Sequence, residues 1–183
     1  MNSNKCNNVF IDDDYSSGNG MLTSVWGPSL WHSLHTISFN YPINPTKEDK
    51  KNYLNLIDNL KYTLPCGICR KNLKNNLKKV PITMKTMKSR HTFSLWLYNL
   101  HEEVNKMLGK KSNLSYEDVR NRYEMFRSRC IKSRKTKKVK KTKKEKGCTK
   151  SLYGKKSKCI INIVPVTKKC KTFKIDSECI LRK

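Results

Sequence analysis

Cys66 and Cys69 are the residues whose type and spacing indicate chemistry most directly. On a helix, two residues three apart share a face, so their sulfurs can close a small disulfide. Pro65 places Cys66 at a helix start, where the dipole and unpaired N–H groups favour a thiolate. The thiolate is the species that exchanges disulfides. The pair therefore indicates redox chemistry, with half a zinc site or two structural cysteines as alternatives.

The surroundings of this pair narrow the kind of redox protein. Zinc needs four ligands, and no second C-x-x-C or Cys/His pair at zinc spacing follows. A thioredoxin-type module carries C-x-x-C on a βαβ framework, whereas the flanks here are helical. A protein that forms disulfides with oxygen needs a cofactor to accept the electrons. A helical bundle rich in aromatic residues and histidines can hold one.

The elements that must position the pair are helices. Apolar residues recur at helical spacing in four long segments and one short one, with no alternating strand pattern among them. We expect Pro28 to start the first helix, and Thr46 and Ser115 to cap two others. The segments are 28–38, 46–60, 66–80, 92–108 and 115–126. The fold class predicted is all-α, a four-helix bundle plus a short fifth helix, with a basic, largely disordered C-terminal tail.

Charge divides the chain of 183 residues, which has 40 Lys and Arg, 14 Asp and Glu, and a net charge of +26. Residues 131–183 contribute +17, and a run of like charges cannot bury itself. We therefore expect a flexible arm at 1–22, a bundle at 23–130 and a Lys-rich, Cys-containing tail at 131–183. The tail is predicted to be solvated, to bind nucleic acid or another polyanion, or to meet a membrane surface. Ile160–Val166 could form one short strand.

Membrane and export signals are missing from the sequence. No stretch approaches the roughly 18 apolar residues of a membrane span, and residues 1–20 are polar. We therefore expect no transmembrane segment and no secretory signal. Without export, the eight cysteines are expected in metal or redox sites more than in structural disulfides.

Five ordered strings resemble the Erv/ALR family of FAD-linked sulfhydryl oxidases. They are WGPSLWHSLH at 26–35, YP at 41–42, LPCGIC at 64–69, FSLWL at 93–97 and HEEVNKMLGK at 101–110. The resemblance covers residues 23–130 with that family's spacings. It implies a helical bundle that is usually a homodimer and binds FAD noncovalently.

The resemblance also implies residue roles. Cys69 would be the catalytic cysteine next to the flavin, and Cys66 the outer one that meets client proteins; the apolar stripe through Leu73 and Leu77 also turns Cys69 inward. A client dithiol would reduce the pair, and electrons would pass through FAD to molecular oxygen, giving hydrogen peroxide. The cofactor-binding residues carried over are Trp26, Gly27, Trp31, His35 and Tyr41, then His101, Val104, Asn105 and Lys110 towards the adenine and ribose–phosphate, and Arg122 with Tyr123.

The sequence departs from the family pattern in three places. Glu102 replaces the usual Asn beside His101, and Thr92 stands where many members have a structural cysteine. No second C-x-x-C acts as a shuttle, so clients reach Cys66 directly or tail cysteines relay electrons. Family members with a terminal-arm disulfide suggest the hypothesis of a Cys6–Cys130 bridge.

The Lys- and Asn-rich composition resembles the family members of large cytoplasmic DNA viruses. It implies the host cytoplasm at the viral assembly site, and the virion, as locations. The alternative function is a basic, nucleic-acid-binding helical protein whose cysteines bind zinc or only pack.

Overall fold

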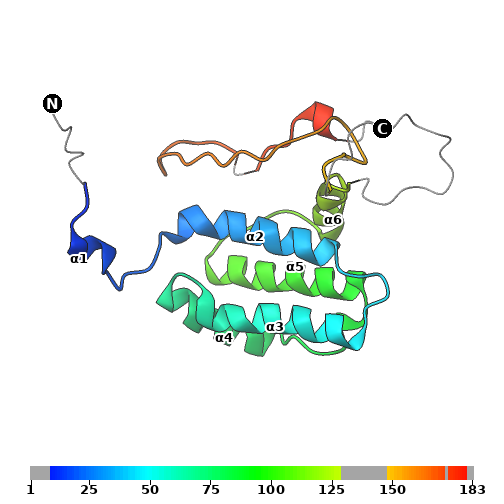
Figure 1. Cartoon of the computed structure of the whole chain (residues 1–183), viewed down its shortest axis with the longest axis horizontal. Coiled ribbons are helices and arrows are strands. Elements are labelled where there is room, and N and C mark those ends of the chain that lie inside the picture. Colours follow the sequence, from blue (N-terminus) through cyan, green and yellow to red (C-terminus); the bar gives the residue numbers. More distant parts are fainter. Residues whose placement is uncertain (1–8, 129–147, 172, 181–183) are drawn as a thin grey trace, which may run out of the picture.

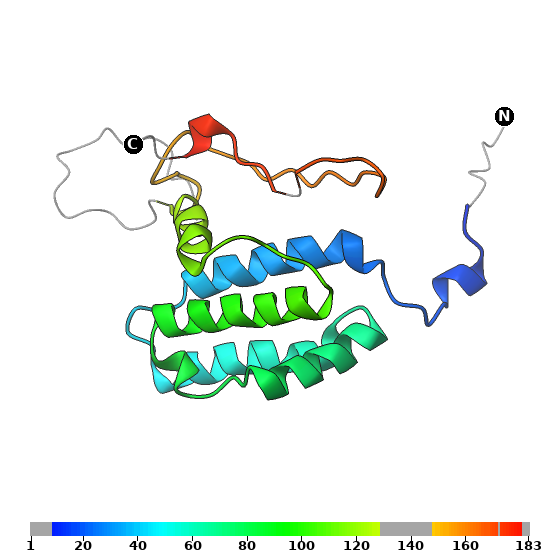
Figure 2. The same ribbon diagram turned by 180° about the vertical axis from the view of Figure 1, so that it is seen from behind.

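The structure, a computed structural model, describes residues 9–128, 148–171 and 173–180, and within these it is helical. Four long helices form the bundle. Figures 1 and 2 show them packed side by side, with a short helix across their end. This confirms the predicted all-α bundle. The α-helices are α1 (Asp12–Tyr15), α2 (Thr23–Phe39), α3 (Lys47–Thr63), α4 (Gly67–Lys79), α5 (Arg90–Met107) and α6 (Tyr116–Glu124), with 3-10 turns η1 (Thr86–Lys88) and η2 (Ser177–Cys179).

Side-chain caps set where the helices begin. Thr46 Oγ1 accepts a hydrogen bond from the Asp49 amide at 3.0 Å, and Ser115 Oγ accepts one from the Asp118 amide at 3.1 Å. In both cases the amide of the capping residue donates in turn to the carboxylate of that aspartate. These capping boxes satisfy amides that have no partner inside the helix. Both predicted N-caps are confirmed.

The start of α2 differs from the prediction. The helix begins at Thr23 and runs through Pro28. A proline disfavours the helical conformation in the residue before it, because its ring clashes with the N–H and the Cβ of that residue. Residue 27 is glycine, which has no Cβ, so one of these two clashes is absent before Pro28. This extra turn brings Thr23 into the helix, which matters for the redox site below.

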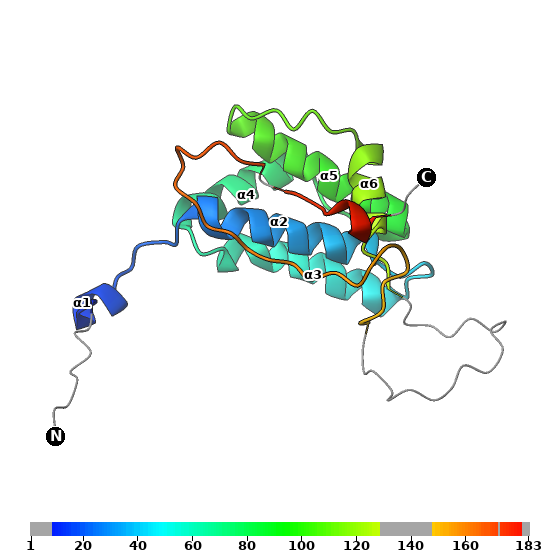
Figure 3. The same cartoon turned by 90° about the horizontal axis from the view of Figure 1, so that it is seen from above.

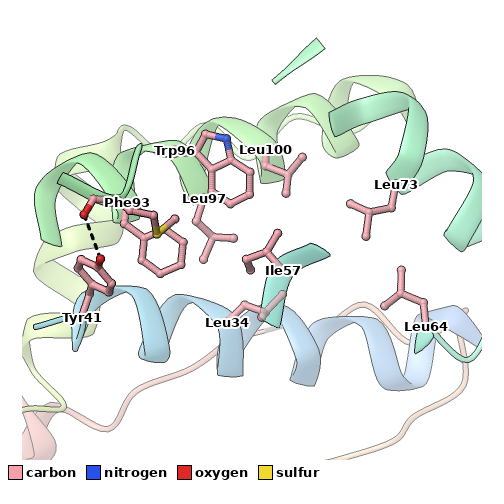
Figure 4. Packing of buried hydrophobic residues seen from close by; sticks show 10 residues of the cluster. Leu34, Tyr41, Ile57, Leu64, Leu73, Phe93, Trp96, Leu97 and Leu100 are labelled. Atoms are coloured by element: carbon pink, nitrogen blue, oxygen red, sulfur yellow. Dashed lines mark hydrogen bonds between the residues drawn. The ribbon is translucent and has the colours of Figure 1, made fainter. Parts of the chain in front are cut away.

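The hydrophobic core lies between the long helices. Its members are Leu34 and Tyr41, Ile57 and Leu64, Leu73, Met87, and Phe93, Trp96, Leu97 and Leu100 of α5. Figure 4 shows Phe93, Trp96, Leu97 and Leu100 of α5 on one side of this cluster, with Leu34 of α2 on the opposite side. Tyr41 is fully buried, and its hydroxyl donates to the Met87 carbonyl at 2.9 Å. A buried hydroxyl needs such a partner, so this bond fixes the loop after α2 against η1.

The described part of the tail is irregular apart from η2. It runs along α2 and returns beside α6 (Figure 3). The strand expected at 160–166 does not form: Ile160, Ile161 and Ile163 are exposed, and no neighbouring strand in the described residues pairs with them. An isolated run cannot satisfy its own backbone groups as a sheet does. No helix in the described ranges is long and apolar enough to cross a membrane.

Candidate redox and cofactor site

The redox pair lies at the start of α4, just after the short connection from α3. Cys66 is the N-cap of α4, and it is disulfide-bonded to Cys69 with a Cα–Cα distance of 5.2 Å. The amide of Cys69 donates to the Cys66 sulfur at 3.2 Å. The expected helix start at the pair is therefore confirmed. Backbone N–H groups and the positive helix end face the sulfurs, and both favour a thiolate once the disulfide is reduced.

Two neighbours of the disulfide come from the chain before and within the first turn of α2. Thr23 Oγ1 lies 3.6 Å from the Cys69 sulfur. The backbone at Gly20 lies so close that a Cβ there would be 2.9 Å from the Pro65 carbonyl oxygen. The next amide, of Met21, donates to that same oxygen at 2.8 Å. The pair is thus held between α4 and the entry to α2, and Cys69 is the inner sulfur because it also packs against the core.

A group of stacked rings lies further along α2. We call it the ring cluster: Trp31, His32, His35 and Phe39 of α2, His101 of α5, Tyr123 of α6, and Phe126 just after α6. Trp31 and His101 stack with centroids 3.9 Å apart and planes 4° apart. Tyr123 stacks on His35 at 5.3 Å and on Phe39 at 5.4 Å. The contacts join three helices through flat faces, a surface suited to another planar aromatic group.

Two histidines form the polar centre of the ring cluster. His35 Nε2 lies 3.0 Å from His101 Nδ1. Burial, with charge repulsion from His101 and His32, lowers the pKa of His35 to about 3. Burial also lowers the pKa of His101 to about 4, with Glu102 opposing and Lys110 adding to the change. Both rings are therefore neutral at pH 7, and one donates its single N–H to the other.

Two histidine nitrogen atoms of the ring cluster have no hydrogen-bond partner among the described residues. They are Nδ1 of His35, which belongs to the neutral pair, and Nδ1 of His32, and both are buried. An unmade bond of this kind costs about 1–3 kcal/mol. If His35 Nε2 donates, its Nδ1 is an unpaired acceptor; if it accepts, Nδ1 is an unpaired donor. Either tautomer gives the ring cluster a buried site for a ligand polar atom.

Tyr123 closes the cluster from α6. Burial raises its pKa to about 12, and the neighbouring Arg122 opposes this change. Its hydroxyl therefore stays protonated through the physiological range. A neutral ring beside a cation suits a planar ligand that carries negative charge at one end.

The other residues predicted to bind the cofactor differ in how close they lie to the ring cluster. Val104 and Asn105 follow His101 on α5, and the Asn105 amide group donates to Glu102 at 2.9 Å. The Lys110 amide donates to the Asn105 carbonyl just after the helix ends. Lys110 also acts on His101 electrostatically. These residues form a polar end of α5 next to the ring cluster.

Trp26, Gly27 and Tyr41 lie apart from the ring cluster. Trp26 donates its indole N–H to the Met21 carbonyl at 3.0 Å, so it lies at the redox end of α2. Gly27 is buried in the helix, and a Cβ there would meet only Thr23 Cγ2 at 3.7 Å. Tyr41 packs in the hydrophobic core against Tyr53 and Phe93.

Sequence reasoning missed several neighbours. His32 and Phe39 fall three residues before and four after His35, which is one helix face, so the spacing contained this signal. Thr23 was missed because Pro28 was taken as the helix start. Glu102 was treated only as a departure, yet it holds Asn105 and opposes the fall in the pKa of His101.

The residues present fit an FAD group. Flavin and adenine are planar, and the ring cluster offers flat ring faces with unpaired histidine atoms. The pyrophosphate is anionic, and Lys110 and Arg122 lie at the edges of the cluster. Helix α2 also connects the redox pair to the cluster: Thr23, which contacts the Cys69 sulfur, precedes Trp31 by eight residues, about 12 Å along the helix axis.

The fold and the site together define a helical redox protein, with a C-x-x-C disulfide beside an aromatic cofactor pocket. Residues 28–124 match the model of the Erv1/Alr family, which is over half of the chain. The chain therefore belongs to the Erv1/Alr family.

Its relatives span viruses and yeast. A probable FAD-linked sulfhydryl oxidase of Acanthamoeba polyphaga mimivirus is 41% identical over 99 residues, 54% of this chain and 68% of the relative. An FAD-linked sulfhydryl oxidase of African swine fever virus is 32% identical over 111 residues, 61% and 90% of the two chains. The fold resembles the yeast Erv1 core, with a TM-score of 0.51 and 20% identity over 67% of this chain and 96% of that one.

Proposed function

We propose that this chain is an FAD-linked thiol oxidase that forms disulfides in client proteins. One observation carries the proposal: the Cys66–Cys69 disulfide caps α4, and its inner sulfur contacts the same helix that holds the ring cluster. When bound, FAD accepts an electron pair from thiols and passes it to oxygen, giving hydrogen peroxide. Family membership and the names of the relatives support the same activity.

The residues of the pair have different tasks in thiol exchange. A client thiolate attacks Cys66, forms a mixed disulfide with it and releases Cys69 as a thiolate. A second client thiol then attacks the mixed disulfide, so the client leaves oxidised and the pair carries two electrons and two protons more. Attack on Cys66 releases Cys69 as the leaving thiolate, and the Thr23 hydroxyl, 3.6 Å from the Cys69 sulfur, can donate a hydrogen bond to that negative charge.

The ring cluster and the end of α5 would hold the cofactor. His35 and His101, neutral at pH 7, offer one hydrogen bond through the unpaired His35 Nδ1. Trp31 and Tyr123 supply flat faces that exclude water. The cations of Lys110 and Arg122 would balance the pyrophosphate. Trp26, Gly27, Tyr41, Val104 and Asn105 remain proposed contacts on the strength of the resemblance.

The test is an absorption spectrum of the purified protein, followed by oxygen uptake after adding dithiothreitol. We expect a flavin spectrum and dithiol-dependent uptake. Cys69→Ser should keep the flavin and abolish uptake, whereas Cys170→Ser, at an exposed free cysteine, should match the unaltered chain. A colourless protein that stays inert after refolding with FAD would refute the proposal.

The alternative, a nucleic-acid-binding protein with zinc-binding or structural cysteines, is not favoured. Cys66 and Cys69 are bonded to each other, which removes both as zinc ligands in this state. If Cys69 has only a zinc-binding or packing role, Cys69→Ser should lower the free energy of unfolding. If the chain is an oxidase, the variant should lose turnover and keep its fold.

A homodimer is proposed from the family resemblance. Sedimentation equilibrium tests this: a monomer at all concentrations contradicts it.

The viral relatives support a viral protein, and we propose the host cytoplasm and the virion as its locations. The proposed division is arm 1–22, oxidase bundle 23–130 and tail 131–183. Lysines of the described tail are exposed, which supports binding of a polyanion such as nucleic acid. Heparin chromatography tests that role, and we expect retention that falls as the salt concentration rises. Retention that does not depend on salt, or no retention at all, would contradict it. The Cys6–Cys130 hypothesis concerns residues outside the described ranges.

A further inference from the structure

We propose that the C-terminal tail is part of the cofactor site, and that Phe173 covers the ring cluster and slows the release of the cofactor. The inference rests on the proposed binding of FAD. It concerns residues 148–171 and 173–180, which the resemblance to the family does not reach.

Phe173 is the point where the tail meets the bundle. Its ring lies 5.5 Å from that of His32 and 6.2 Å from that of Phe126, between α2 and α6. The Arg122 guanidinium lies over the same ring, 5.2 Å from its centroid. Phe173 is half-buried, whereas the apolar residues of 160–166 are mostly exposed. Phe173 is therefore the aromatic side chain through which this part of the tail contacts the ring cluster.

The segments on either side of Phe173 are held in place by specific bonds. The Leu152 amide donates to the Arg127 carbonyl at 2.7 Å, which fastens the beginning of the described tail to the end of α6. The Lys155 amide donates to the Glu178 carbonyl at 2.8 Å, and the two side chains form an ion pair at 2.9 Å. The tail is thereby closed into a loop whose two ends meet near α6 (Figure 3).

Gly154 makes this closure possible. Its φ is +61°, a left-handed conformation that L side chains rarely adopt. A Cβ at this position would lie 2.5 Å from the Cys179 carbonyl carbon, which is backbone and cannot move aside cheaply. The sequence thus places a glycine where the two limbs of the loop cross. A solvated tail without a docked arrangement would not need it.

Phe173 lies over two residues of the proposed cofactor site. His32 carries a buried Nδ1 without a hydrogen bond, and Arg122 is one of the cations proposed for the pyrophosphate. The loop covers both. A cofactor held in the ring cluster would leave only after this cover opened, so the tail acts on the dissociation rate, while the bundle supplies the contacts that orient the ligand.

The test uses the full-length, FAD-loaded protein and measures the fluorescence of free flavin after dilution. We compare Phe173→Ala with Phe173→Tyr, which keeps the ring, and with Val166→Ala, which removes a tail side chain that is 99% exposed. The loss of one half-buried ring should speed release about 5- to 20-fold in Phe173→Ala. Phe173→Tyr and Val166→Ala should stay within about twofold. Gly154→Ala should resemble Phe173→Ala, because it opens the loop.

A second readout does not depend on the cofactor. In the flavin-free protein, trypsin should cut after Lys174 faster in Phe173→Ala than in Val166→Ala. Equal cleavage would show that Phe173 does not dock the tail, and would overturn the inference. Equal FAD release in the two variants would overturn it and leave the oxidase proposal intact. Slower release in Phe173→Ala would overturn it as well, since the tail would then compete with the cofactor. A chain that takes up no FAD at all overturns the oxidase proposal and this inference together.

Discussion

Lowering the pH from 7.5 to 5.5 should destabilise the flavin-free protein, because His35 and His101 are buried as a neutral pair. Their folded-state pKa values are lowered to about 3 and about 4 from the usual 6.5. As the pH falls below 6.5, the unfolded chain binds a proton at each histidine while the folded chain does not. The free energy of unfolding therefore falls with pH, and the loss is complete only when the pH passes through the folded pKa values.

The magnitude follows from these pKa values. At pH 5.5 each histidine of the unfolded chain is mostly protonated, which costs about 1.4 kcal/mol per residue relative to pH 7.5. The two rings interact, so we expect a combined loss of roughly 2–3 kcal/mol. His32, whose pKa burial also lowers, acts in the same direction. Carboxylates with lowered pKa values, such as Glu124 beside Arg127, lose their contribution mainly below about pH 5, so the histidines dominate between pH 7.5 and 5.5.

The assay is urea unfolding at pH 7.5, 6.5 and 5.5, followed by tryptophan fluorescence. His101→Asn should remove about half of the pH dependence, whatever its own stability at pH 7.5. His91→Asn, at an exposed site on the same helix, should leave the dependence unchanged. A free energy of unfolding that is constant or rises between pH 7.5 and 5.5 would refute the reasoning. It would mean that the histidine pair is hydrated or already charged in the folded state.

Three further changes test the redox end and the core. Gly20→Ala places a Cβ 2.9 Å from the carbonyl oxygen before the redox pair, so dithiothreitol should reduce the disulfide at a changed rate, whereas Gly18→Ala, where nothing lies within 4 Å, should not alter it. Thr23→Val removes the hydroxyl 3.6 Å from the Cys69 sulfur, and alkylation of reduced Cys69 should slow about 2- to 5-fold in stopped-flow measurements. Leu97→Ala empties a fully buried site and should cost about 2–5 kcal/mol in chemical unfolding; a loss under 1 kcal/mol would contradict the packing described.

Local features of the fold were predictable because their causes lie within a few residues of each other. Thr46 and Ser115 cap helices through bonds to residues three positions on, and the apolar stripe predicted the inward turn of Cys69. The start of α2 was predicted wrongly because a rule about proline was applied without the preceding residue. Gly27 lacks the Cβ that contributes to the clash with a following proline.

The site depends on contacts between distant segments, which spacing alone does not specify. Thr23 meets Cys69 across 46 positions, and His35 meets His101 across 66. The family resemblance named both histidines, because its strings record which residues recur together. It could not name Thr23, which lies just before the first string.

The tail marks the limit of reasoning from composition. Its charge predicted a solvated segment, and the lysines at the described positions of the tail are exposed. The net charge of the tail does not show which of its residues contact the bundle, and that contact depends on a few particular residues. Phe173 supplies the contact, Gly154 permits the crossing, and Lys155 pairs with one of the few acidic residues available, Glu178. A basic segment can therefore keep its charged side chains in water and still place one half-buried aromatic ring on the ring cluster.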